Sequence, residues 1–266
     1  MSKEIIIKTK RTTNYVYLSD KGSDMPMVFL HGFTGSHHSW DNVIEKLKRR
    51  TLTLDLPGHG KSTFNDLDAN YSIDDWCEDF NEILNSLNID KVDLCGYSMG
   101  GRLATGFAIK YPEKINKLIL ESTSFGIENK DEREARLKED LRLCRLIEED
   151  SPKFVQKWEN SPLFAKQQDR NPQGFLSQRK ERLSHNPIQL SKALKSFSQG
   201  NMGFYKSKMT EFKFPLILIN GSEDGRYIEI GKNIIGICRD FNQHVIEDCG
   251  HNIHLENLDK FVEKLL

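Results

Sequence analysis

Short, mainly apolar runs most limit what this chain can fold into. Each is followed by a glycine, a proline or a polar break, and they cover residues 27–30, 52–56, 92–95, 118–120 and 216–219. Runs of this length are typical of strands that are buried on both faces of a parallel sheet. Helical patterns lie between them. The sequence therefore predicts an α/β fold with a mostly parallel, doubly wound sheet.

Two helices and one hairpin are marked by local signals. Ser72 is placed to cap a helix whose apolar side chains recur at 3.6-residue spacing. A second helix is expected to begin at Ser98 and to stop before Pro112, because proline disfavours a helical residue ahead of it. Residues 5–7 and 15–18 have no helix between them, so they predict an antiparallel hairpin at the sheet edge.

A charge-rich stretch breaks the alternation of strands and helices. It predicts helices without strands, over residues 132–149, 153–160, 172–184 and 187–198. Such an insertion is expected to cover the carboxyl ends of the strands, where open α/β sheets bind their ligands. We therefore expect an α/β core made of residues 1–125 and 204–266, and a helical cap made of residues 126–203.

Composition argues against several classes of protein. The 266 residues carry a formal net charge of −1, with both signs spread along the chain, which argues against a nucleic-acid partner. No apolar run approaches the about 20 residues that span a bilayer, and residues 1–5 do not begin a signal peptide. The five cysteines lack metal-ligand spacing. We expect a cytoplasmic protein with reduced thiols and no membrane insertion, and the oligomeric state stays open.

The segment Gly96-Tyr97-Ser98-Met99-Gly100 fits the pattern G-x-S-x-G, with a predicted strand before it and a predicted helix after it. That context is the one a nucleophile elbow requires. Glycines two residues either side of the serine let strand and helix approach closely. The alternative is an ordinary strand–turn–helix connection.

Two loops are candidates for an oxyanion hole. His31-Gly32-Phe33-Thr34-Gly35 follows a predicted strand, and in such a site one N–H donor comes from this loop and one from the residue after the nucleophile. We assign the donors to the backbone N–H groups of Phe33 and Met99. His31 is expected to bond the loop backbone, and His59 is expected to be a turn residue.

An acid and a base are expected after the serine in the chain. Glu223 and Asp224 compete for the acid, since both follow the predicted strand at residues 216–219. His251 follows Gly250 in the last histidine-bearing loop, and His254 is the weaker candidate because it lies inside a helical pattern.

These motifs resemble the α/β-hydrolase fold family over essentially the whole chain. The elbow with Arg102, then Leu120-Glu121-Ser122, the segment 132–136 with Asp140, residues 154–158 and Pro162-Leu163-Phe164 resemble one branch of it. That branch is the family of 2-succinyl-6-hydroxy-2,4-cyclohexadiene-1-carboxylate synthases of menaquinone biosynthesis. Its members are lyases that remove pyruvate from an enolpyruvyl precursor, and they use no metal and no organic cofactor.

The resemblance implies a role for individual residues. Those that match the family triad are Ser98, Asp224 and His251, which favours Asp224 over Glu223. Those that match substrate-binding positions are Tyr97, Arg102, Arg136, Trp158 and Arg182. The similarity weakens after Ser191, so contacts made by residues 195–201 are not implied.

A polycarboxylate substrate suits these residues, because arginine binds carboxylates through two parallel hydrogen bonds and stays charged. Arg102 lies one turn after Ser98 on the expected helix. The arginines have simpler explanations as well. Arg102 is also placed for a surface ion pair and Arg136 for one with Asp140, while Trp158 is also suited to the cap core.

Three functions remain open at this stage. In the lyase, Ser98 acts as a base that takes a proton from the substrate ring. In the first alternative, a serine hydrolase (an esterase, a thioesterase or a carbon–carbon hydrolase), the same triad forms an acyl-enzyme. The second alternative is a ligand-binding receptor on the same fold. Arginines that face the serine would favour the lyase over an enzyme with an apolar acyl pocket.

Overall fold

The structure is a computed structural model that describes residues 3–22 and 25–266. Residues 1–2, on which part of the signal-peptide expectation depends, lie outside the described residues. Within the described part, nine strands form one sheet in the order β1-β2-β4-β3-β6-β7-β8-β9, with β5 paired to β2. The strands are β1 (Lys3–Lys8), β2 (Thr12–Ser19), β3 (Met27–Leu30), β4 (Thr51–Leu54), β5 (Thr63–Phe64), β6 (Val92–Tyr97), β7 (Ile115–Glu121), β8 (Leu216–Gly221) and β9 (Phe241–Ile246).

The pairing of the strands confirms the predicted fold class. β1 and β2 pair antiparallel, and β1 forms one edge of the sheet, as expected of the hairpin. β2 also pairs antiparallel with β4, whereas β3, β4, β6, β7, β8 and β9 run parallel to one another. The carboxyl ends of the parallel strands therefore meet at one edge of the sheet.

Alternate side chains of each buried strand enter two different cores. Val28 and Leu30 of β3 belong to the core formed with α2 (Ile73–Ser86) and α3 (Met99–Lys110). Met27 and Phe29 belong to the core on the other face, with α1 (Asp41–Lys46), α10 (Ile253–Glu256) and α11 (Leu258–Glu263). Because both faces are covered, β3, β7 and β8 carry apolar side chains on both faces, which is why they could be recognised in the sequence.

The helix ends follow local capping chemistry. Ser72 caps α2 in a capping box with Asp75, and α3 stops at Lys110, two residues before Pro112. α9 (Gly225–Lys232) follows β8 closely, and 3₁₀ turns occupy η1 (His37–Trp40), η2 (Pro112–Lys114) and η4 (Lys206–Glu211).

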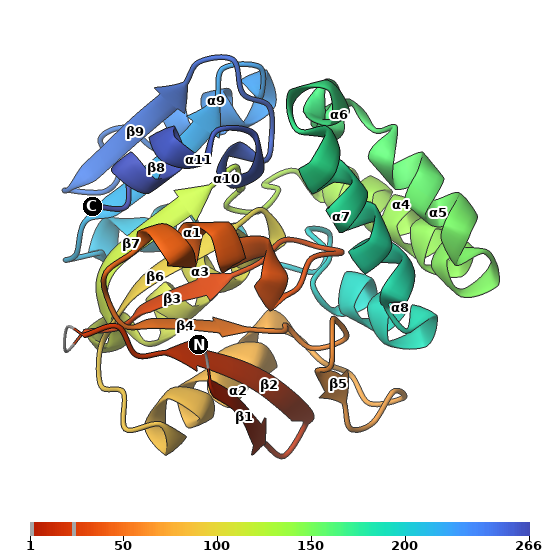
Figure 1. Cartoon of the computed structure of the whole chain (residues 1–266), viewed down its shortest axis with the longest axis horizontal. Coiled ribbons are helices and arrows are strands. Elements are labelled where there is room, and N and C mark those ends of the chain that lie inside the picture. The colour runs from red at the N-terminus through yellow and green to blue at the C-terminus, as the bar shows by residue number, and fades with distance from the viewer. Residues whose placement is uncertain (1–2, 23–24) are drawn as a thin grey trace.

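Between β7 and β8 the chain forms helices and no strand, and Figure 1 shows them in green and cyan on one side of the sheet. They are α4 (Lys130–Glu149), α5 (Ser151–Glu159), η3 (Pro162–Phe164), α6 (Gln167–Arg170), α7 (Pro172–Ser184) and α8 (Pro187–Ser196), followed by η4. We call residues 126–203 the insertion; its treatment as a cap domain stays a prediction. Three predicted helices have different ends in the structure. α4 begins at Lys130 after its cap Asn129, α5 begins at Ser151 after its cap Asp150, and α8 stops at Ser196. The short α6 was missed.

Among the described residues, no helix combines the length and the apolar content that crossing a bilayer requires. All five cysteines are buried and unpaired.

Candidate active site

Ser98 lies at the turn between β6 and α3. Its backbone has φ 51° and ψ −108°, a strained conformation for a residue with a side chain. A Cβ on Gly96 would lie 2.6 Å from the carbonyl oxygen of Gly100, and a Cβ on Gly100 would lie 2.3 Å from that of Leu30. Only glycine permits these approaches. The turn has the geometry of a nucleophile elbow, which presents the serine hydroxyl at the edge of the sheet.

Ser98, His251 and Asp224 form one hydrogen-bonded chain. Nε2 of His251 lies 3.0 Å from Oγ of Ser98, and Nδ1 of His251 lies 2.8 Å from Oδ2 of Asp224. Asp224 follows β8 and His251 lies in the loop after β9, so both come from the edge that carries Ser98. Both side chains are buried. With Asp224 accepting from Nδ1, Nε2 can exchange a proton with the serine.

The competing acid and base have other partners. Glu223 forms ion pairs with Lys166 and with Arg170. His254 is buried, and its Nδ1 lies 2.6 Å from Oε2 of Glu121. The structure therefore places Asp224 and His251, rather than Glu223 and His254, in the chain that reaches Ser98.

The loop that carries Phe33 lies beside the elbow. A Cβ on Gly32 would lie 3.6 Å from Cβ of Ser98, so the Phe33 peptide group is close to the serine. Met99 is the first residue of α3, where a backbone N–H has no acceptor within the helix. The two N–H groups come from the two segments that supply donors to an oxyanion hole in this kind of site.

The two loop histidines are held by the backbone. Nδ1 of His31 lies 2.7 Å from the carbonyl oxygen of Gly32, and the N–H of Leu56 donates to Nε2 at 2.9 Å. Both ring nitrogens are thus used by a neutral imidazole, and burial lowers the pKa of His31 to about 4. His59 lies in the turn after β4, and burial lowers its pKa as well.

Arg102 and Arg136 bring two positive charges close together. Arg102 is buried, and its Nη2 donates to the carbonyl oxygen of Phe197 at 3.0 Å. Burial, and then the charge of Arg136, lower the pKa of Arg102 to about 10, so it stays charged at neutral pH. Arg136 forms the ion pair with Asp140 that its spacing suggested, at 2.9 Å through Nε. Among the described residues, this pairing leaves both Nη groups of Arg136 available to an anion.

Arg182 is buried next to Tyr97. It pairs with Glu159 at 3.1 Å, and its guanidinium lies 5.1 Å from the ring centroid of Phe164. Arg182, Tyr97, Phe33 and Phe164 line a cavity of about 20 Å³. A cavity of that size has room for about one water molecule.

Trp158 lies between the apolar core of the insertion and the loop that carries Phe33. Its ring centroid lies 5.4 Å from that of Phe33 and 5.9 Å from that of Phe154. Nε1 of Trp158 is buried, and no described residue accepts its hydrogen. The side chain therefore has both a packing role and an unused donor near the site.

Two aromatic residues beside His251 were given no role by sequence reasoning. The ring centroid of Tyr227 lies 4.6 Å from that of His251, and the ring centroid of Phe164 lies 6.3 Å away. Tyr227 follows Asp224 by three residues, in the first turn of α9, so its spacing was a usable signal. Phe164 was noted in the sequence without a role.

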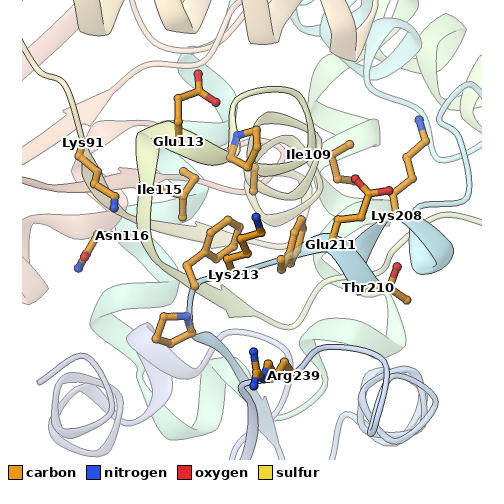
Figure 2. Close-up of a pocket in the computed structure, with 15 residues that line it drawn as sticks. Lys91, Ile109, Glu113, Ile115, Asn116, Lys208, Thr210, Glu211, Lys213 and Arg239 are labelled. Atoms are coloured by element: carbon orange, nitrogen blue, oxygen red, sulfur yellow. The ribbon is translucent and has the colours of Figure 1, made fainter.

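A wide concavity lies elsewhere in the molecule. It has a volume of about 1260 Å³ and lies where β6, β7 and β8 begin, opposite to the edge that carries Ser98. Figure 2 shows Lys213 and Ile115 in it, with Lys91 to one side and Arg239 below. It contains none of the predicted site residues.

The elbow, the hydrogen-bonded triad and the parallel sheet together define a class of protein. The chain belongs to the family with the α/β hydrolase fold, whose sequence model matches residues 25–258.

Two named relatives indicate which members of this family the chain is similar to. A Bacillus subtilis protein with the provisional name 2-succinyl-6-hydroxy-2,4-cyclohexadiene-1-carboxylate synthase is 36% identical over 86% of this chain and 85% of its own length. The Escherichia coli K12 protein of that name is 30% identical over 87% of this chain and 88% of its own.

Two solved structures are similar to this chain over nearly its whole length. MenH from S. aureus has a TM-score of 0.89 at 30% identity, and it covers 94% of this chain and 96% of its own. A thermophilic esterase from Thermogutta terrifontis reaches a TM-score of 0.82 at 21% identity, covering 99% of this chain and 96% of its own, and shows the shared fold alone.

Proposed function

We propose that this chain is a carbon–oxygen lyase of menaquinone biosynthesis. It eliminates pyruvate from 2-succinyl-5-enolpyruvyl-6-hydroxy-3-cyclohexene-1-carboxylate and gives 2-succinyl-6-hydroxy-2,4-cyclohexadiene-1-carboxylate. One observation carries the proposal: a hydrogen-bonded Ser98–His251–Asp224 chain in a protein whose buried arginines lie near the same sheet edge. The names of the relatives described above support the same reaction.

The arginines suit a substrate with three carboxylates. Arg102 comes from the core, and Arg136 and Arg182 come from the insertion. Burial strengthens the attraction of a guanidinium for a carboxylate, because little water competes there. In this proposal Tyr97 and Trp158 contact the substrate as well, and residues 126–203 act as the cap that encloses it.

Ser98 acts as the base in the proposed mechanism. Its oxygen takes the proton from the ring carbon, while its own proton moves to Nε2 of His251, which Asp224 orients. The electron pair of the broken C–H bond becomes part of the conjugated ring. The bond from the ring to the enolpyruvyl oxygen breaks, and the pyruvate enolate that leaves takes up a proton.

The oxyanion hole stabilises the charge that develops. Negative charge from the ring carbon spreads to the succinyl carbonyl oxygen, and the N–H groups of Phe33 and Met99 donate to it. Donors fixed in advance act on the charge without reorganising, which is why they lower the barrier.

The experiment that tests the proposal is pyruvate release by the purified protein given the enolpyruvyl substrate. Ser98→Ala is expected to lower the rate of pyruvate release by about 10⁴-fold or more, while calorimetry still detects substrate binding. A p-nitrophenyl ester is the control for the hydrolase alternative. Equal turnover of that ester, or a stable acyl-Ser98 adduct during turnover, would contradict the proposal.

A further inference from the structure

Arg170 connects the insertion to both loops that carry the triad. It lies at the end of α6, and its guanidinium reaches two carboxylates that come from different elements of the core. Nη2 of Arg170 lies 2.6 Å from Oε1 of Glu223, and Nη1 lies 2.6 Å from Oε2 of Glu256. A single side chain of the insertion thus bridges two segments of the core.

Both carboxylates sit next to a catalytic residue. Glu223 immediately precedes Asp224 in the loop after β8. Oε2 of Glu256 accepts the backbone N–H of Gly250 at 2.8 Å, and Gly250 immediately precedes His251. The two loops are also bonded to each other, because the N–H of Glu223 donates to the carbonyl oxygen of Cys249 at 3.0 Å.

The position of Arg170 is enclosed. The side chain of Glu256 is 0% exposed and that of Arg170 is 17% exposed. A buried carboxylate is costly without a partner, so Arg170 fixes the charge of Glu256 in place. Nδ2 of the next residue, Asn171, donates to the carbonyl oxygen of Leu255 at 2.9 Å, which is a second contact between the insertion and α10.

We infer that Arg170 is a positioning residue, which aligns Asp224 and His251 when the insertion docks on the core. It touches no reacting atom and acts through Glu223 and Glu256. The inference deepens the proposed function, since it rests on activation of Ser98 by His251. It also gives the insertion a second role, because the insertion then keeps Asp224 and His251 aligned, besides carrying Arg136 and Arg182.

The decisive experiment compares Arg170→Met with Lys166→Met. Lys166 is the matched control, because its only carboxylate partner in the described part of the chain is Glu223, at 2.9 Å, and it is 62% exposed. The readout is the rate at which a small fluorophosphonate modifies Ser98, which depends on triad alignment and not on the substrate-binding arginines. Arg170→Met is expected to slow this reaction by on the order of tenfold, since small displacements of catalytic groups cost such factors. Lys166→Met is expected to leave it unchanged.

The kinetics of pyruvate release distinguish a positioning role of Arg170 from a role in docking the insertion alone. If Arg170 aligns the triad, Arg170→Met lowers kcat more than it raises KM. If Arg170 only holds the insertion in place, KM rises and the fluorophosphonate rate of the variant equals that of the parent protein, which overturns the inference. Circular dichroism and the unfolding temperature of both variants check that the fold is kept.

A double variant tests whether Arg170 acts through Glu223, and the result does not depend on the overall stability of the protein. If Arg170 acts through Glu223, adding Glu223→Gln to Arg170→Met changes the fluorophosphonate rate by less than the sum of the two single effects. Full additivity contradicts this route. Should the parent protein release no pyruvate while the Arg170 contrast persists, the proposed lyase function fails and the positioning role stands.

Discussion

The edge of the sheet and the insertion contribute to the site in different ways. At the edge, Ser98 and Asp224 each closely follow the end of a parallel strand, β6 and β8, and the topology brings them together. In the insertion, Arg136 and Arg182 lie within helices, and each is held by an acid of the same insertion, Asp140 or Glu159.

Under the proposed function, the contrast separates the residues of the chemical step from those that bind the substrate. A residue at the end of a strand has its position fixed by hydrogen-bonded pairing over the whole sheet. A residue on a helix face depends on how a few side chains pack, so its direction can change with little effect on the fold. Substitutions at the sheet edge should therefore act on kcat, and substitutions in the insertion should act on KM.

The largest effect is expected at the sheet edge. Asp224→Asn is expected to lower kcat by about 10⁴-fold with little change in KM, because the amide no longer holds His251 in the tautomer that takes the serine proton. Pyruvate release measures both constants. Asp248→Asn is the control in the loop of His251, since Asp248 is exposed and has φ 57°, which asparagine tolerates. A large rise in KM for Asp224→Asn would break the contrast.

A smaller effect is expected in the insertion, on KM. Arg182→Met is expected to raise KM by roughly 10- to 100-fold, the range that corresponds to one lost charged hydrogen-bond pair. Arg179→Met is the matched control: Arg179 pairs with the same Glu159 at 2.6 Å, yet its side chain is 44% exposed. Equal effects of the two substitutions on KM would show that loss of the Glu159 pair, not substrate contact, is responsible.

The sequence predicted the sheet edge better than the insertion, for a physical reason. Buried parallel strands and the two glycines beside Ser98 leave local signals, because any other residue would clash there. The order of strands then carries Asp224 and His251 to the same edge. By contrast, the spacing of Arg136 and Asp140 was compatible with a plain ion pair, and that ion pair is present.

Contacts between distant segments left no signal in the sequence. Arg170 finds Glu223 and Glu256 only after the insertion has folded against the core. The segment after Ser191, where the family similarity weakens, also contacts a residue that is distant in the sequence. Oγ of Ser198 lies 2.7 Å from Oδ2 of Asp140.

Ser198→Ala probes that segment and is expected to have a still smaller effect. Without its hydroxyl, Asp140 loses one of its partners, and Arg136 is held less firmly. KM is expected to rise about threefold to tenfold, in line with the loss of an ordinary hydrogen bond, because Ser198 acts on the substrate only through Asp140 and Arg136, while kcat stays nearly constant. Steady-state pyruvate release measures this. An unchanged KM would mean that the ion pair alone orients Arg136.

Where the two regions meet, the expected effect concerns stability rather than rate. His185, at the end of α7, accepts the N–H of Gly60 at its Nδ1, and its Nε2 lies 3.0 Å from the carbonyl oxygen of Thr34. Its ring centroid lies 5.5 Å from that of His59, which lies 5.0 Å from that of His31. Burial lowers the pKa of all three histidines.

The free energy of unfolding should therefore fall as the pH falls from about 6.5 towards 4. Between the ordinary pKa of 6.5 and the folded-state pKa of about 4, the unfolded chain binds a proton at His31 that the folded chain excludes. His31 alone is expected to lower the free energy of unfolding by about 2 kcal/mol from pH 7 to pH 5, and His59 and His185 act in the same direction. Urea unfolding at the two pH values measures the difference. His31→Gln should reduce it, and substitution of the exposed His38 should not; a pH dependence that is the same in both variants would mean that these buried imidazoles do not control it.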